Sequence, residues 1–413
     1  SNQTFYLINR SIKMSSTPID QHQQQLSSLN LQCRERSSEA RLHLYNNLTK
    51  KKELFVPING NEVRWYSCGP SFYDKFHMDV VRYYITLDIL RRVMKNYFGY
   101  DVVYYMNIHD VDEKIFNLTD EKNSKTNMDI DAASAASTPL CKESINNSYD
   151  FPKLSKTFNS IMKYNDTNRK LSQDMFNKLF EALHILPPSF GSFTSLTDIM
   201  SSTVFDICTS GCNLNSARHD GDTAQLQAFN NNNIVSSMTY VIEIGGLAAD
   251  QNEIATVFNT TDELTAKNKH HNLRLYCLLN PWSSMLNLMN NENDNVTTYH
   301  RAIKSFIHDV GKSLKTAKTL KLINPYIILN EYDNKMNQEF SEIKKKIYIA
   351  LCDGIDLPGA MEQIMNLMTI TEEYTKMEKI HVKLIENIYD FIMNLLKIFG
   401  LKYEDVFHCN EDY

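Results

Sequence analysis

The chain has 413 residues, enough for two or three domains around a large buried core, and its hydrophobic content of 42% and charged content of 22% are ordinary for a globular protein. The net charge of −6 excludes a strongly basic nucleic-acid-binding protein, although one locally basic face remains compatible with it. The eight cysteines form no Cys-x-x-Cys pair and no apolar run reaches the length of a membrane span, so neither a disulfide framework nor a membrane protein is expected.

The first forty residues are rich in Gln, Ser and Asn, and this composition predicts a disordered tail. Arg10 and Lys13 precede the first acid, Asp20, so a mitochondrial presequence is the alternative reading of this segment. The expected location of the protein is cytoplasmic, with reduced thiols.

Regular structure is expected from Leu42 onward. Residues 42–70 are typical of short strands around an Asn59-Gly60 turn, and the last strand ends at Gly69. Residues 79–100 have apolar side chains at helical spacing as far as Gly99, and residues 101–108 form a strand that is apolar on both faces. A strand, a helix and a strand in this order predict a parallel βαβ unit.

The second half of the chain is expected to be helical. Residues 116–170 are polar and predict a loop or insertion, residues 171–200 are partly helical, and residues 201–262 contain one clear strand, 240–244. From Asn272 onward, helical periodicity predicts a bundle that closes at Gly400. The predicted organisation is a tail (1–40), an α/β domain (41–270), an α-helical bundle (271–405) and a second tail (406–413).

One long segment resembles a known family. The run WYSCGPSFYDKFHMDVV, followed by a helix and a strand ending in NIHDVDEKI, resembles the first catalytic segment of cytosolic eukaryotic cysteinyl-tRNA synthetases, which reads YxCGPTVYD, HMGHAR and NITDIDDKI. The resemblance covers roughly residues 42–115 and 190–405. It implies a Rossmann-like class I synthetase nucleotide domain with a parallel sheet, followed by a helical bundle. Part of the family's middle insertion and its anticodon-binding tail are missing, so no specific tRNA binding is expected.

The positions that bind ATP in the family are mostly replaced. The HMGH signature becomes His77, Met78, Asp79 and Val80, so its second imidazole and its glycine are lost; alternatively, Asp79 is simply a helix N-cap. The KMSKS loop, whose lysines neutralise the pyrophosphate leaving group, becomes Ala249-Asp250-Gln251-Asn252-Glu253. A second lysine run, Gly311–Lys315, is read as exposed helix lysines.

The zinc site of the family is also mostly replaced. Cys68 matches the first of its four ligands, but Phe193 stands at the second, Arg218 replaces a histidine and Asp222 is shorter than the glutamate. Cys68 is then read as a small apolar residue at a strand end, and no metal is expected at Cys208 and Cys212. The glycine-rich turn DIHGGG becomes Asp206–Gly211 and keeps one glycine of three.

Scaffold positions therefore match the family better than the positions of its chemistry. The leading hypothesis is a catalytically inactive pseudoenzyme that acts by binding a protein partner, without zinc or ATP as cofactors. The vestigial site then comprises Gly69, Tyr73 and His77 for the nucleotide and Cys68 for the metal. Two alternatives remain, namely a divergent but active cysteine-tRNA ligase, and a sensor of nucleotide or cysteine with a pocket around Cys68, Tyr73 and His77.

Overall fold

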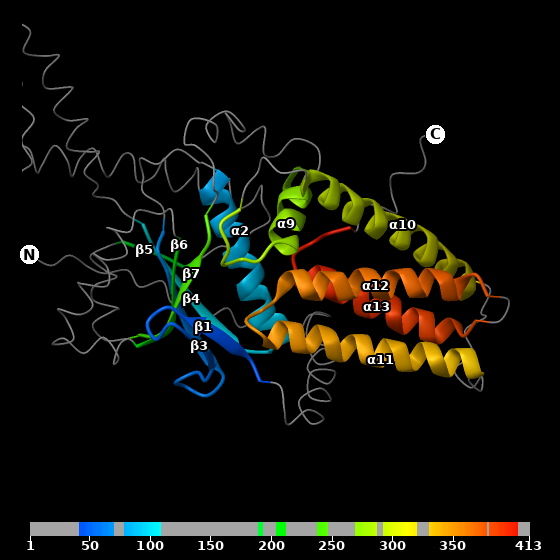
Figure 1. The fold of residues 1–413 in the computed structure, drawn as a ribbon, viewed down its shortest axis with the longest axis horizontal. Coiled ribbons are helices and arrows are strands. Elements are labelled where there is room, and N and C mark those ends of the chain that lie inside the picture. The colour runs from blue at the N-terminus through cyan, green and yellow to red at the C-terminus, as the bar shows by residue number, and fades with distance from the viewer. Residues whose placement is uncertain are drawn as a thin grey trace, which may run out of the picture.

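A computed structural model describes residues 41–69, 78–108, 189–192, 204–211, 238–246, 269–286, 292–319, 330–377 and 380–403. A five-stranded parallel sheet lies at one end of the molecule, and long helices extend from it (Figure 1). The predicted fold class, a parallel α/β domain followed by a helical bundle, is confirmed. Among the described residues, no helix is long and apolar enough to cross a membrane.

A small antiparallel hairpin precedes the main sheet. Strand β1 (His43–Asn46) pairs with β2 (Lys51–Leu54), so the turn between them is formed by residues 47–50. The Asn46 side chain accepts a hydrogen bond from Leu48 N–H at 3.1 Å and stabilises this turn. The predicted Asn59-Gly60 turn exists, with Gly60 at φ +67°, but it leads into the first strand of the main sheet rather than joining the hairpin strands.

The strand order of the main sheet is β5-β4-β3-β6-β7, and every neighbouring pair is parallel. The predicted parallel pairing is confirmed, with Trp65 opposite Tyr104. The sequence reading missed β5 and β6; for β6 this is because its run FDICTSG contains few strand-favouring residues. The strands are β3 (Glu62–Ser67), β4 (Asp101–Ile108), β5 (Ser189–Ser192), β6 (Phe205–Gly211) and β7 (Met238–Ile244).

Helix α2 (Met78–Arg92) lies between the sheet and the helical bundle (Figure 1). Every residue from Val80 to Arg91 is buried, because this helix has protein on nearly all sides. The helix continues as a π-helical turn, η1 (Val93–Tyr97), in which Phe98 N–H reaches Val93 O at 3.1 Å. The chain then turns at Gly99, with φ +76°, where the helix was predicted to stop.

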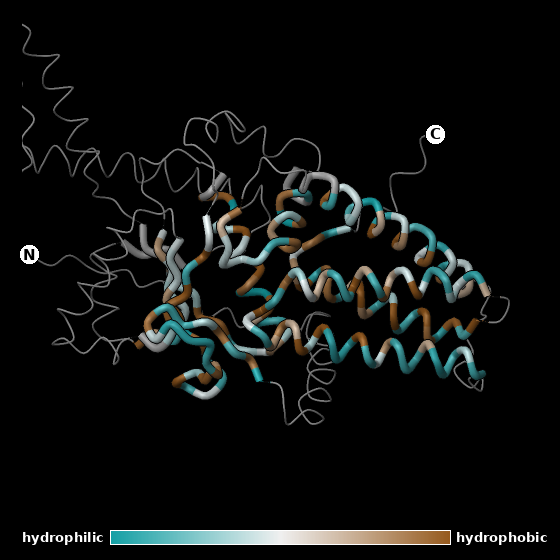
Figure 2. Tube along the Cα trace, viewed as in Figure 1, coloured by the Kyte–Doolittle hydropathy of each residue, from teal (hydrophilic) through white to brown (hydrophobic). Residues whose placement is uncertain are grey.

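The bundle begins at α9 (Lys269–Leu279), slightly earlier than predicted. Figure 2 shows teal and brown alternating along α10 and α11, as expected for helices with one face in the core. Residues 311–315 lie inside α10 with Lys312 and Lys315 exposed, as expected. The bundle helices are α10 (Glu292–Thr319), α11 (Glu331–Cys352), α12 (Leu357–Thr375) and α13 (Val382–Ile398).

Gly400 ends α13, as the sequence predicted. Its φ is +79°, and Leu401 N–H donates to Leu396 O at 2.9 Å, which is the hydrogen bond of a Schellman motif. A Cβ at Gly400 would lie 2.5 Å from Arg274 Nη1, so this position also has no room for a side chain.

Buried arginines join the bundle to the α/β domain. Arg82 on α2 donates to the carbonyl oxygens of Gly246 and Ser284, the latter at 2.7 Å. Asp88, also on α2, pairs with Arg274 of α9 at 2.8 Å, and Arg274 in turn donates to Phe399 O at 3.2 Å. Three segments that are distant in the sequence are therefore joined around one helix.

His381 caps the first turn of α13, and its replacement provides a first test of the bundle. Its Nδ1 accepts from Leu384 N–H at 3.2 Å, and its own N–H donates to Tyr374 Oη at 2.8 Å. We expect His381→Ala to lower the free energy of unfolding by about 1 kcal/mol, the usual value of an N-cap. His381→Asn keeps a capping acceptor and should retain most of that stability in chemical denaturation. An equal loss in both variants would show that packing, not capping, is the contribution of His381.

Candidate functional site

The strand order places a ligand-binding position at one edge of the sheet. The chain adds β4 and β5 on one side of β3, then crosses over to add β6 and β7 on the other side. In open parallel sheets, ligands bind outside the carboxyl ends of the strands where the order reverses, which here is between β3 and β6. The described residues at this edge include Gly69, Gly211 and Gly246, and α2 begins there at Met78.

The structure describes part of the predicted site. Gly69 and Cys68 follow β3 at this edge, and Val80 lies in the first turn of α2. Tyr73 and His77 lie outside the described residues. The residues that the resemblance aligns with zinc ligands, Phe193, Arg218 and Asp222, also lie outside the described residues. So does the run aligned with the KMSKS loop, Ala249–Glu253.

Cys68 is enclosed by apolar groups. It is 4% exposed and packs in a small cluster with Tyr66, Phe205, Cys208 and Val241 on one face of the sheet. Its N–H donates to Thr209 O at 3.1 Å. Among the described residues, Cys68 is thus packed as one member of an apolar cluster. No group of three metal-ligating side chains occurs within the described ranges.

The first turn of α2 contains residues that the resemblance aligns with an ATP-binding signature. Val80 is 7% exposed and belongs to the main hydrophobic core, so this position contributes packing instead of a hydrogen-bond donor. Asp79 is the second residue of α2 as the structure describes it.

Residues 206–211, which the resemblance matches to a glycine-rich turn with two of its three glycines lost, lie in the buried strand β6. Asp206 lies at the amino end of β6, away from the ligand edge, and its carboxylate accepts from Ile58 N–H at 2.7 Å and Arg64 N–H at 2.8 Å. A run of small polar residues is compatible with either a turn or a strand buried on both faces, and here it forms a strand.

Thr209 is the polar centre of the β3–β6 junction. Its Oγ1 accepts from Trp65 Nε1 at 2.6 Å, and its carbonyl accepts from Cys68 N–H and from Tyr83 Oη at 3.1 Å. These polar atoms of Thr209 therefore form hydrogen bonds within the protein. A nucleotide site would instead require groups that point at the ligand.

Burial dominates the electrostatics of the two phenols near this junction. Burial raises the pKa of Tyr83 well above its ordinary value. Burial also raises the pKa of Tyr104 to about 12, although Arg91 lies 4.0 Å from its ring centroid and Ser67 Oγ lies 2.5 Å from its hydroxyl. Both phenols therefore stay protonated at neutral pH and cannot serve as general bases.

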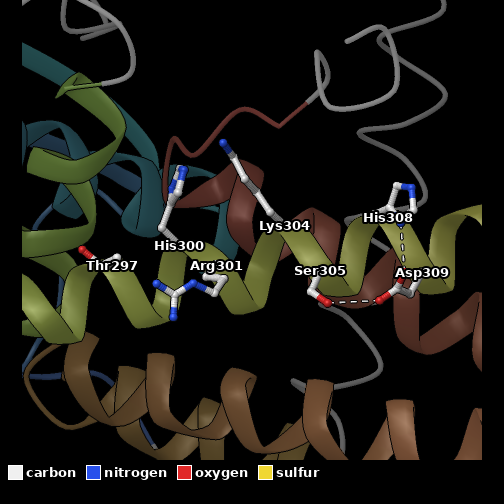
Figure 3. A pocket seen from close by; sticks show the side chains of 7 residues that line it. All are labelled: Thr297, His300, Arg301, Lys304, Ser305, His308 and Asp309. Carbon is white, nitrogen blue, oxygen red and sulfur yellow. Dashed lines mark hydrogen bonds and ion pairs between the residues drawn. The ribbon is translucent and has the colours of Figure 1, made fainter. Parts of the chain in front are cut away.

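A cavity of about 500 Å³ lies elsewhere, and every described residue that lines it belongs to α10 (Figure 3). Its lining includes His300, Arg301, Lys304 and His308. Sequence reasoning did not identify these residues as a site. The available signal was the basic residues that recur every three or four positions along α10.

Comparisons with known proteins agree with the sheet topology. A family model described as the catalytic domain of class I (C) tRNA synthetases matches residues 54–200. The cytoplasmic cysteine–tRNA ligase of Drosophila melanogaster is 22% identical over 536 aligned positions, which cover 87% of this chain and 72% of that protein. The human cytoplasmic cysteine–tRNA ligase is 60% identical over 75 residues, which cover 18% of this chain and 10% of that protein.

Two solved structures share the fold at low sequence identity. A methionyl-tRNA synthetase from Mycobacterium tuberculosis, in complex with methionyl-adenylate, superposes with a TM-score of 0.55 at 9% identity, covering 84% of this chain and 93% of that one. An arginyl-tRNA synthetase from Thermus thermophilus gives 0.51 at 7% identity, covering 92% and 85%. These similarities show the architecture only.

Proposed function

For this chain, a cysteinyl-tRNA synthetase-like protein with a class I synthetase fold, we propose a role in binding a protein partner rather than in activating cysteine. The observation that carries this proposal is the burial of Val80 in the core, at the position where the resemblance expects a phosphate-contacting imidazole. Cytoplasmic cysteine–tRNA ligases among the relatives support a cytoplasmic location. The net charge of −6 gives no general attraction to tRNA.

Cysteine activation needs positive charge and hydrogen-bond donors directed at the phosphates of ATP. Arg82, a buried cation of α2, donates to backbone carbonyls at the junction with the bundle. In the alignment suggested by the resemblance, no lysine remains at residues 249–253, and Asp250 and Glu253 bring negative charge. Because one such donor is worth about 10²- to 10³-fold in rate, we expect a combined loss of about 10⁴-fold or more.

The proposal is tested by cysteine-dependent exchange of pyrophosphate into ATP. We expect the purified full chain to give no exchange above background, beside an active cysteine–tRNA ligase as positive control. His77→Ala is the matched negative control, because His77 is the one signature imidazole that remains. Exchange that is present in the chain and disappears in His77→Ala would establish the alternative function, a divergent ligase.

We also propose that the chain holds no resident zinc. The support is the apolar cluster around Cys68 together with the replaced ligands Phe193 and Arg218, which leave too few donors for a tetrahedral site. Elemental analysis of protein purified without chelator should find far less than one zinc per chain, and Cys68→Ser should leave that value unchanged. One equivalent of zinc that is lost in Cys68→Ser would overturn the proposal.

A further inference from the structure

We propose that the outer face of α10 is a docking surface for the acidic segment 404–412 of the same chain. Five basic residues, here called the basic stripe, line this face: Arg301, Lys304, His308, Lys312 and Lys315. At 100° per residue they fall within an arc of about 80°. The opposite face packs into the core through Ile303, Phe306, Ile307, Val310 and Leu314, so the stripe faces outward.

The side chains of the basic stripe are cationic, and one acid of the same helix lies beside them. The acid beside it, Asp309, accepts from Ser305 Oγ at 3.0 Å and pairs with His308 at 2.9 Å, and these two hydrogen bonds lower its pKa (Figure 3). The stripe contributes four formal positive charges, and Glu372 of α12 lies close enough to Asp309 for the two carboxylates to repel each other. Like charges at this helical spacing repel one another, so an anionic partner would stabilise the face.

Tyr403 brings the acidic segment to one end of the basic stripe. Its ring lies 5.9 Å from that of His300, its hydroxyl lies 3.5 Å from His300 Nδ1, and its side chain is buried. His300 is one turn before Lys304, and Figure 3 shows both side chains on the same side of α10. Burial lowers the pKa of His300, and the positive charge of Lys304 lowers it further.

The segment after Tyr403 has the charge and the length to match the basic stripe. It carries four carboxylates: Glu404, Asp405, Glu411 and Asp412. From His300 to Lys315 the helix rises by about 22 Å, and nine extended residues after Tyr403 reach about 30 Å. Individual exposed ion pairs are weak, but a tether of this length gives an effective concentration in the millimolar range. The docked segment would cover α10 against other polyanions.

Zero-length carbodiimide cross-linking of the full chain, read by mass spectrometry, tests the proposal. We expect amide cross-links within one chain between Lys304 or Lys315 and a carboxylate of the acidic segment. The double variant Arg301→Glu, Lys312→Glu removes neither reacting lysine, yet it should lower the yield of these cross-links about ten-fold. Raising the salt from about 0.05 M to about 1 M should act in the same direction, because the Debye length falls to about 3 Å.

The matched control is Lys345→Glu, Lys346→Glu, an equal charge reversal at two exposed positions of α11. It should leave the yield of these cross-links unchanged. Cross-links that join two chains would assign the basic stripe to a second copy. Cross-links to carboxylates elsewhere in the chain, or no cross-links at Lys304 and Lys315, would also overturn the proposal.

Discussion

Replacing Asp88 by Asn is expected to lower the apparent melting temperature of the protein by roughly 10 °C. Asp88 is fully buried, and its carboxylate lies 2.7 Å from Arg92 Nε and 2.8 Å from Arg274 Nη1, with Arg91 at 3.7 Å. Breaking a buried ion pair by removing one partner typically costs about 3–5 kcal/mol, because the other charge stays buried. In domains of this size, each kcal/mol shifts the midpoint by about 2–4 °C.

The environment of Arg274 shows why the loss should be large. Burial lowers the pKa of this guanidinium, and Asp88 opposes that shift. Without the carboxylate, three arginines would remain close together in the interior. The control is Glu339→Gln, which breaks the exposed pair with Lys335 and should change the midpoint by less than about 2 °C. Equal midpoints for Asp88→Asn and the unmodified protein in differential scanning fluorimetry would contradict this account.

Replacing Gly245 by Ala is expected to destabilise the protein by about 3 kcal/mol or more, at the upper end of overpacking effects. A Cβ at this position would lie 2.1 Å from Ser284 O and 2.4 Å from Ser284 C, both backbone atoms that no side-chain rotation can move away. Relief would have to separate β7 from residues 282–286. It would then break the hydrogen bond from Gly245 N–H to Trp282 O at 3.0 Å and that from Leu286 N–H to Gly246 O at 2.9 Å.

Gly99→Ala is the matched control for Gly245→Ala. Gly99 has φ +76° but no heavy atom within 4 Å of the added Cβ, so its replacement measures conformational strain without overlap. A non-glycine residue in this conformation costs about 1–2 kcal/mol. Urea denaturation of both variants compares the two effects. If Gly99→Ala is as damaging as Gly245→Ala, the close approach of the backbones is not the reason for Gly245.

The strength of the local pattern decided which elements could be predicted. The strand at 101–108 and the helix ending at Gly99 were predicted because apolar periodicity and a stop signal agree there. The strand β6 was missed because Asp206, Thr209 and Ser210 are turn-favouring residues. Asp206 and Thr209 are accommodated in a buried strand because Ile58, Arg64, Trp65 and Tyr83 supply hydrogen bonds from elsewhere in the chain.

The sequence identified which residues of the candidate site match or differ from the family pattern, but not how those residues are arranged in space. Motif spacing identified Asp79 and Val80 as altered positions and Cys68 as the one retained zinc ligand. Their surroundings could not be read from the chain, because the apolar cluster around Cys68 combines residues from β3, β6 and β7. Proximity between parallel strands depends on the order in which they assemble, and no local pattern encodes that order.

The sequence by itself determined the fold class, the strand–helix–strand unit and the glycine stops at Gly99 and Gly400, because each depends on residues close together in the chain. Only the tertiary structure decided that Asp88 meets Arg274, that Gly245 has no room for a side chain, and that Tyr403 lies against His300. These contacts join residues more than a hundred positions apart, or backbones whose approach depends on the packing of whole elements. They arise when burial of apolar surface brings helices and sheet together, and not from the conformational preference of any single segment.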